Sequence, residues 1–354
     1  MVAERVATIA AILAERMRRQ RIGNPLGPDD DAQELIGAIQ PICTGPFARP
    51  GSPPWLAPRT DFDDLRATDR LRRNRTLVKG RFQGGGIGYV LARDLEIYAN
   101  AFRKPLVEPS DFQRQVLDVL RSTGPLTPRQ LKEETGLLNK QIMPALQRLQ
   151  TAFLVYEDQL DDDWERSWYD FRSEWPGVSV GDEHRESALV EVLQRFLRAH
   201  VFATLEQIRD WSRIPVRQIK DVLHSLEVRR LLRRCAVTGA GEGYCLPGDE
   251  TQPDDSPPPA VFILHRADFL VRSHASELKR RFSGREVLQY LLVEGEICGA
   301  VCGHWGFRPY DVDDIALDLP PRRIKALKDE IVEIVRAAYP EPRHRIVHYA
   351  GRPL

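Results

Sequence analysis

The chain has 354 residues, which is enough for two or three compact units with cores of their own. Its 51 basic and 51 acidic residues cancel, so no overall field attracts polyanions and any nucleic-acid affinity must come from local patches. No apolar run is long enough for a membrane helix, and the five cysteines are too scattered for a disulfide framework. We therefore expect a cytoplasmic protein without membrane contact.

The first 110 residues read as a helical unit that ends in a hairpin. Helices are predicted up to about Arg21, from Asp31 onward and over 61–71, followed by strands at 75–82 and 87–91. A glycine run at 84–86 joins the strands. It lacks the strand-to-helix context of a dinucleotide-binding loop, so we interpret it as the tip of the hairpin.

An internal repeat follows, because residues 112–155 match residues 189–232 without a gap at an offset of 77. The apolar positions carry the match and have the spacing of a core-facing helix. In the first helix of each copy they are Phe112, Val116, Val119 and Leu120, matched by Leu189, Leu193, Phe196 and Leu197. In the third helix they are Ile142, Ala145, Leu146 and Leu149, matched by Ile219, Val222, Leu223 and Leu226.

The second helix of each copy has a matched start signal. Thr127 with Gln130 and Thr204 with Gln207 each have the spacing of a capping box. A β-type run follows each third helix, so each copy reads as a helix triplet with a hairpin, which is a winged helix. The alternative is a chance likeness between two three-helix bundles.

The rest of the chain supplies a connector, a linker and a last module. Residues 158–185 are acidic, and their aromatic residues at helical spacing are expected to dock on a neighbouring core. Residues 247–259 read as a flexible linker, and the C-terminal part contains a hairpin around Glu294 and Gly295 and a proline-led helix over 320–339.

The predicted fold class is α+β and mainly helical, with tandem winged-helix units before a small β-rich C-terminal module with a terminal helix. The predicted domains are a divergent winged-helix unit at 1–110, a second unit at 111–157, the connector at 158–185, a third unit at 186–246, the linker at 247–259 and the C-terminal module at 260–354.

Two groups of polar and basic residues are candidates for DNA contacts. One lies between the third predicted helix and the first hairpin, and comprises Arg66, Arg70, Arg72, Arg73, Arg75, Lys79 and Arg81. The other lies on the third helix of the second repeat, where a major groove would meet Arg217, Gln218 and Lys220. A solvated helix face and a scaffold helix are the respective alternatives.

Metal chemistry is not expected, although Cys298, Cys302 and His304 lie close together in the sequence. Residues four apart on a strand are separated by roughly 13 Å, which tetrahedral zinc does not span. A buried thiol face is the better interpretation.

The chain resembles the AlkZ/YcaQ family of winged-helix DNA glycosylases. The residues that carry the likeness are those at 18–21, 39–42 and 75–80, together with Gly295, Gly299 and Gly303 in the closing hairpin module. The resemblance implies excision of bulky alkylated or crosslinked purines by a Gln-x-Gln or Gln-x-Asp motif that positions water. Gln40 matches the first member, whereas the second position is Ile42, which has no hydrogen-bonding group.

Two functions follow as hypotheses. The first is a DNA-repair protein that hydrolyses an N-glycosidic bond, with Gln40 as the catalytic residue and no metal or cofactor. Asp61, Asp63 and Asp64 are conceivable replacements for the missing partner. The second is a non-catalytic winged-helix DNA-binding protein, which Ile42 favours. Both imply a monomer that binds double-stranded DNA, damaged in the first case, and is nucleoid-associated when bound.

Overall fold

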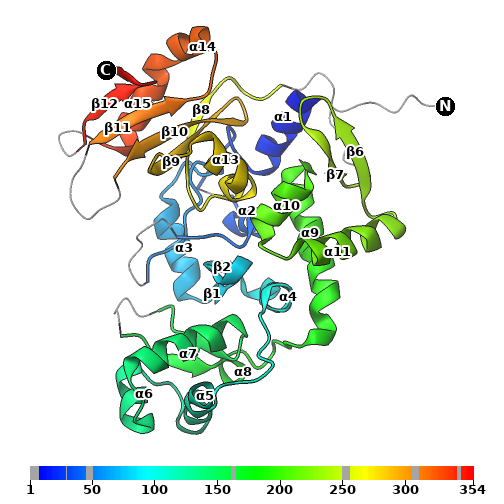
Figure 1. The fold of residues 1–354 in the computed structure, drawn as a ribbon, viewed down its shortest axis with the longest axis vertical. Coiled ribbons are helices and arrows are strands. Elements are labelled where there is room, and N and C mark those ends of the chain that lie inside the picture. The colour runs from blue at the N-terminus through cyan, green and yellow to red at the C-terminus, as the bar shows by residue number, and fades with distance from the viewer. Residues whose placement is uncertain are drawn as a thin grey trace.

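The computed structural model describes residues 8–28, 30–44, 51–160, 165–248, 256–304, 311–340 and 344–354. Along the longest axis of the molecule, the C-terminal sheet lies at one end and the unit that contains α5 to α8 lies at the other (Figure 1). The predicted α+β class is confirmed. In the described part of the chain, no helix is long and apolar enough to cross a membrane.

The N-terminal unit has the predicted order of elements. It contains α1 (Ile9–Arg19), α2 (Ala32–Ile39) and α3 (Asp64–Arg73), followed by the antiparallel pair β1 (Leu77–Arg81) and β2 (Ile87–Leu91). The glycine run forms the tip of this hairpin as the short helix η1 (Gln83–Gly85). A turn of 3-10 helix, η2 (Ala92–Asp94), then leads into α4 (Leu95–Phe102), which the sequence analysis did not predict.

The first repeat folds as a helix triplet with paired strands. Its helices are α5 (Asp111–Thr123), α6 (Pro128–Thr135) and α7 (Asn139–Thr151). The Thr127 capping box is present, Pro128 occupies the first turn of α6, and α7 runs through Pro144. Strand β3 (Val155–Glu157) pairs with β4 (Trp168–Asp170), which belongs to the segment predicted as connector.

The aromatic residues of that segment do not form the expected helical stripe. Trp168 lies in β4, Phe171 begins the one-turn helix α8 (Phe171–Glu174), and Trp175 is the C-cap residue after it. Trp168 and Phe171 are buried, so they pack into the core as expected. Trp164 lies outside the described residues. Phe112, in contrast, was predicted to face the core and is exposed in the first turn of α5.

The second repeat has the same plan. Its helices are α9 (Arg185–His200), α10 (Leu205–Ser212) and α11 (Val216–Val228), and its hairpin pairs β6 (Arg233–Val237) with β7 (Gly241–Cys245). Strand β5 (Phe202–Ala203) adds to β7. The Thr204 capping box is present, and Arg213 ends α10 in the left-handed conformation that Gly136 adopts in the first repeat. The second helix of each repeat therefore begins with a capping box and ends in a left-handed residue.

The C-terminal module is built on a sheet in which, among the described residues, six strands have the order β13-β12-β11-β10-β9-β8. The predicted hairpin is β9 (Val287–Val293) with β10 (Glu296–Gly303). The strands around it are β8 (Val261–His265), β11 (Val312–Leu317), β12 (Ile346–Tyr349) and β13 (Arg352–Pro353). The proline-led helix is divided into α14 (Pro321–Ala326) and α15 (Lys328–Ala338), and β12 and β13 follow it.

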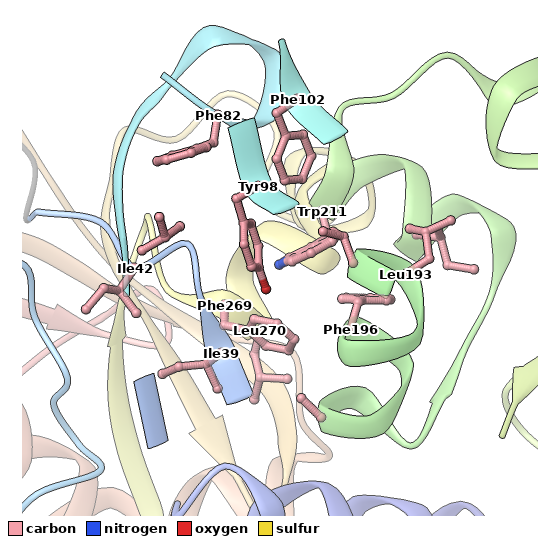
Figure 2. Packing of buried hydrophobic residues seen from close by; sticks show 14 of the residues in the cluster. Ile39, Ile42, Phe82, Tyr98, Phe102, Leu193, Phe196, Trp211, Phe269 and Leu270 are labelled. Carbon is pink, nitrogen blue, oxygen red and sulfur yellow. The ribbon is translucent and has the colours of Figure 1, made fainter. Parts of the chain in front are cut away.

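One hydrophobic core joins these regions. Ile39 and Tyr98 of the N-terminal unit pack in the same cluster as Phe196 and Trp211 of the second repeat and Phe269 of α12 (Phe269–Ser273), as Figure 2 shows. The linker predicted at 247–259 falls largely outside the described residues. Helix α13 (Ala275–Arg281) follows α12 after His274.

Candidate active site

Gln40 lies at the C-terminal end of α2 and is 1% exposed. Its side-chain carbonyl accepts a hydrogen bond from the backbone amide of Leu91 at 2.9 Å, and its amide nitrogen donates to the Asp94 carboxylate at 2.7 Å. Because the Leu91 amide can only donate, it fixes the orientation of the Gln40 amide. Both ends of this amide are therefore occupied by neighbours.

Asp94 ends the turn that follows β2, and its carboxylate links Gln40 to α9. Arg195 of α9 contacts the other carboxylate oxygen at 2.8 Å and also contacts Glu191 at 2.7 Å. Burial alone would lower the pKa of Arg195, but its hydrogen bonds to Asp94 and Glu191 raise that pKa above its ordinary value. The arginine is thus a permanent cation beside the carboxylate.

Tyr98 closes the other side of this group. It is 1% exposed, lies in the aromatic core drawn in Figure 2, and burial raises the pKa of its hydroxyl. The hydroxyl therefore stays protonated. Gln40, Asp94, Arg195 and Tyr98 come from four separate elements, so only the folded chain brings them together.

A cleft of about 890 Å³ opens over Asp94. Among the described residues, arginines outnumber acids in its lining, which includes Arg18, Arg19, Arg21, Arg93, Arg195 and Arg198 together with Glu34, Asp94 and Glu191. Arg18 and Arg19 also pair with Glu15, each at 2.6 Å. We call this space the arginine cleft. It is supplied by the end of α1, by α2, by η2 and by α9. An excess of arginine around an open cleft suits the binding of phosphate groups.

Ile42 does not face this cleft. It is 4% exposed, its side chain belongs to the main hydrophobic cluster, and its backbone pairs with that of Tyr89. Of the conceivable replacements, Asp63 caps α3 through the amide of Arg66, and Asp64 accepts from the amides of Leu56 and Ala57. Each therefore has a local structural task in the loop and helix where it lies.

The basic residues predicted around α3 and β1 differ in their exposure to solvent. Arg66, Arg70 and Arg73 are exposed, and Arg73 contacts Asp69 at 2.8 Å. Arg75, which is half-buried, pairs with Glu174, and Arg81, also half-buried, donates to Gln150 at 2.6 Å.

Two members of that group are buried. Arg72 is 0% exposed and contacts Asp69 at 2.7 Å and the backbone carbonyl of Gln159. Lys79 contacts Glu157 at 2.8 Å, and burial lowers the pKa of Lys79 to about 8 although Glu157 favours the charged form. The predicted patch therefore does not present all its charges on one surface.

The residues predicted on α11 are placed differently. Arg217 and Lys220 are exposed, and Gln218 is half-buried and accepts from Arg185 at 3.4 Å. A second basic cleft, of about 780 Å³, includes Arg213 at the turn before α11 together with Arg266, Arg272, Lys279 and Arg285. Arg272 also donates to the backbone carbonyl of Pro41 at 2.7 Å.

The cysteine residues form no disulfide. Cys298 and Cys302 belong to different hydrophobic clusters, because the β10 register shifts between them, and the described residues contain no group of side chains suited to a metal. Cys235 and Cys245 are less scattered than the sequence suggested, since their sulfur atoms are 2.9 Å apart across the β6–β7 hairpin.

The arrangement of these modules matches that of a solved DNA glycosylase. The structure superposes on the Streptomyces sahachiroi DNA glycosylase AlkZ with a TM-score of 0.70, covering 97% of this chain and 100% of that one at 15% sequence identity. The family model for "DNA glycosylase AlkZ-like" matches residues 55–305, so the chain belongs to the AlkZ-like DNA glycosylase family. No curated protein matches the sequence.

Sequence reasoning selected Gln40 but missed the groups around it. Asp94 lies 54 residues further along the chain, and Arg93, Arg195 and Arg198 have no motif that connects them. The available signal is the arginine-rich end of α1 at 18–21, which carries part of the family resemblance. It forms one wall of the arginine cleft.

Proposed function

We propose that this protein is a DNA glycosylase that releases a bulky alkylated purine from double-stranded DNA by hydrolysing its N-glycosidic bond. Family membership supports DNA as the substrate. The observation that carries the proposal is the Asp94 carboxylate, which Gln40 holds at the wall of the arginine cleft, since the cleft suits a phosphate backbone and the carboxylate suits a bound water. The exposed side chains of Arg217 and Lys220 on α11 supply further DNA contacts.

In the proposed reaction, water attacks the anomeric carbon of the sugar as the bond from that carbon to the purine nitrogen breaks. The purine leaves with the bonding electron pair, and a water proton must be removed. Alkylation that places positive charge on the purine makes it a better leaving group. The arginines bind phosphates and position the nucleotide, while Gln40 holds the Asp94 carboxylate near the water.

The second candidate is a DNA-binding protein of the same fold without catalysis. Ile42 favours it, because that side chain packs in the core where the family's motif has a polar residue. Such a protein binds DNA tightly and in a salt-dependent manner but leaves the lesion strand intact.

One comparison separates the candidates. The purified chain is incubated with duplex DNA that carries an alkylated purine, and abasic sites are counted for the wild type, Gln40→Ala and Gln159→Ala. Gln159 is a matched control, because it is also fully buried and hydrogen-bonded but lies beside Arg72 and Leu77, away from the arginine cleft. We expect abasic sites with the wild type and Gln159→Ala and a large loss with Gln40→Ala. Binding without abasic product by the wild type would support the second candidate.

A further inference from the structure

We propose that Asp94 is the catalytic residue that holds the attacking water, in place of the polar side chain that position 42 lacks. This inference rests on the proposed glycosylase function. It assigns the contact with water to a residue outside the 40–42 segment and within the range matched by the family model.

The geometry separates Gln40 from the cleft. Gln40 is 1% exposed and does not line the arginine cleft, whereas Asp94 lines it and is 7% exposed. A bound water can therefore reach the Asp94 carboxylate from the cleft but meets no free polar atom of Gln40. Gln40 is accordingly a positioning residue that acts through Asp94.

Three carboxylates line the described wall of the cleft, and they differ in burial and in the number of side chains that hold them. Glu34 is exposed, and the side chain of Glu191 is 42% exposed. Asp94 is buried and receives hydrogen bonds from Gln40 at 2.7 Å and Arg195 at 2.8 Å. A buried carboxylate that two donors hold in place is better preorganised to bind a water than Glu34, which is exposed, or Glu191, which is more exposed and, among the described residues, contacts only Arg195.

The environment of Asp94 also suits the charges of the reaction. Arg195 balances the negative charge of the carboxylate, which still has lone pairs for a further hydrogen bond. The water oxygen forms the new bond to the sugar carbon, the purine nitrogen keeps the electrons of the broken bond, and Asp94 accepts the water proton. This proton then passes to solvent in the cleft, and no oxidant, reductant or metal is required for the balance.

The test measures chemistry and binding separately in the full-length protein. Single-turnover release of an alkylated purine and the Kd for the same duplex are determined for the wild type and Asp94→Asn. Loss of a positioned base costs roughly 100-fold to 10,000-fold in rate. We expect Asp94→Asn to slow release by at least about 100-fold while the Kd changes less than about 3-fold, because the side chain keeps its size and cleft position.

Asp314→Asn is the matched control for stability. Asp314 is also a buried aspartate bound to an arginine, Arg285 at 2.6 Å, but it lies in the C-terminal sheet. The variant Asp314→Asn should lower the melting temperature as Asp94→Asn does, and it should leave base release unchanged. If Asp94→Asn does not fold, Asp94→Glu carries the test, since it keeps the charge, moves the carboxylate and should slow release at least about 10-fold.

The outcomes are distinct. If folded Asp94→Asn releases the purine within about 3-fold of the wild-type rate, the role of Asp94 is overturned and the glycosylase function stands. The same holds for folded Asp94→Glu if Asp94→Asn does not fold. Absence of release by the wild type itself overturns the proposed function and this assignment together.

Discussion

Gln40 is a single buried residue whose side-chain amide is used at both ends in hydrogen bonds within the protein. Its two polar ends contact Leu91 and Asp94, so the side chain crosslinks the end of α2 to the turn after β2. Gln159 makes a comparable set of buried hydrogen bonds, mainly to backbone groups. What distinguishes Gln40 is the carboxylate that it holds against a cleft.

Ile42 gives a prediction at the same scale. Ile42→Gln restores the residue type of the family motif, yet the position lies in the hydrophobic cluster. A buried amide without partners costs about 1–3 kcal/mol, so we expect a lower free energy of unfolding and no gain in base release. Urea denaturation and single-turnover release measure the two effects. A stable variant with faster release would contradict the placement of Ile42 and favour a direct role for position 42.

Burial explains which site residues were open to prediction. Charges that pair within one helix are visible in the sequence, as with Arg73 and Asp69, which are four residues apart. The burial of Lys79 depends on Glu157 of another unit, and the exposure of Asp94 to the cleft depends on α9. Such relations come from tertiary packing and leave no local pattern.

Elements were predicted well where their signals are local. The capping boxes at Thr127 and Thr204 and the apolar stripes fixed the two helix triplets, apart from the exposed Phe112. Strand β4 was missed because a long segment separates it from β3. The other strands of the C-terminal sheet, β8, β11, β12 and β13, were also missed. Strand β8 pairs with β9 across two helices, and β12 pairs with β11 in parallel across a helical crossover, so neither pairing leaves a local signal.

The repeat offers a matched comparison of two helices. Arg217 on α11 and Lys140 on α7 occupy equivalent positions at the offset of 77, and both are exposed. If α11 contacts the DNA backbone, Arg217→Ala should weaken binding and reduce the slope of log K against log salt by about 0.9, whereas Lys140→Ala should leave both unchanged. Fluorescence anisotropy over a range of salt concentrations measures the slope. The opposite pattern would place the DNA on the first repeat.

The whole molecule is held together by buried contacts between its ends. Arg59 and Asp268 form an ion pair at 2.6 Å with side chains 1% and 2% exposed, which joins the N-terminal unit to the C-terminal module. Arg16 of α1 is also buried and donates to the backbone carbonyls of His200 and Phe202. The walls of the arginine cleft come from the N-terminal unit and from α9, so the contact of Arg16 with the end of α9 helps to set the shape of the cleft.

Breaking the Arg59–Asp268 pair should therefore destabilise the molecule. Asp268→Asn leaves a buried arginine without its counter-ion, and we expect a loss of about 3–5 kcal/mol in the free energy of unfolding. Burial alone would raise the pKa of Asp268, but Arg59 outweighs burial and holds that pKa below its ordinary value of 3.8. The contribution of the carboxylate is thus present above about pH 3.8 and lost as the pH falls further.

Chemical denaturation of the wild type and Asp268→Asn at neutral pH and at successively lower pH checks this expectation. The difference between the two proteins should be constant near neutrality and shrink once the pH falls below that ordinary value. A difference that grows on acidification would show that the pair does not stabilise the ionised carboxylate.

Glycosylase activity is tested most directly by following the lesion-containing DNA strand through one turnover. Excess protein is mixed with a duplex that contains an alkylated purine, and mass spectrometry follows both the free base and the strand. We predict one free purine for each abasic strand formed, without added metal or cofactor. An intact lesion strand recovered from a stable complex across a range of alkylated purines would contradict the claim that this chain is a glycosylase.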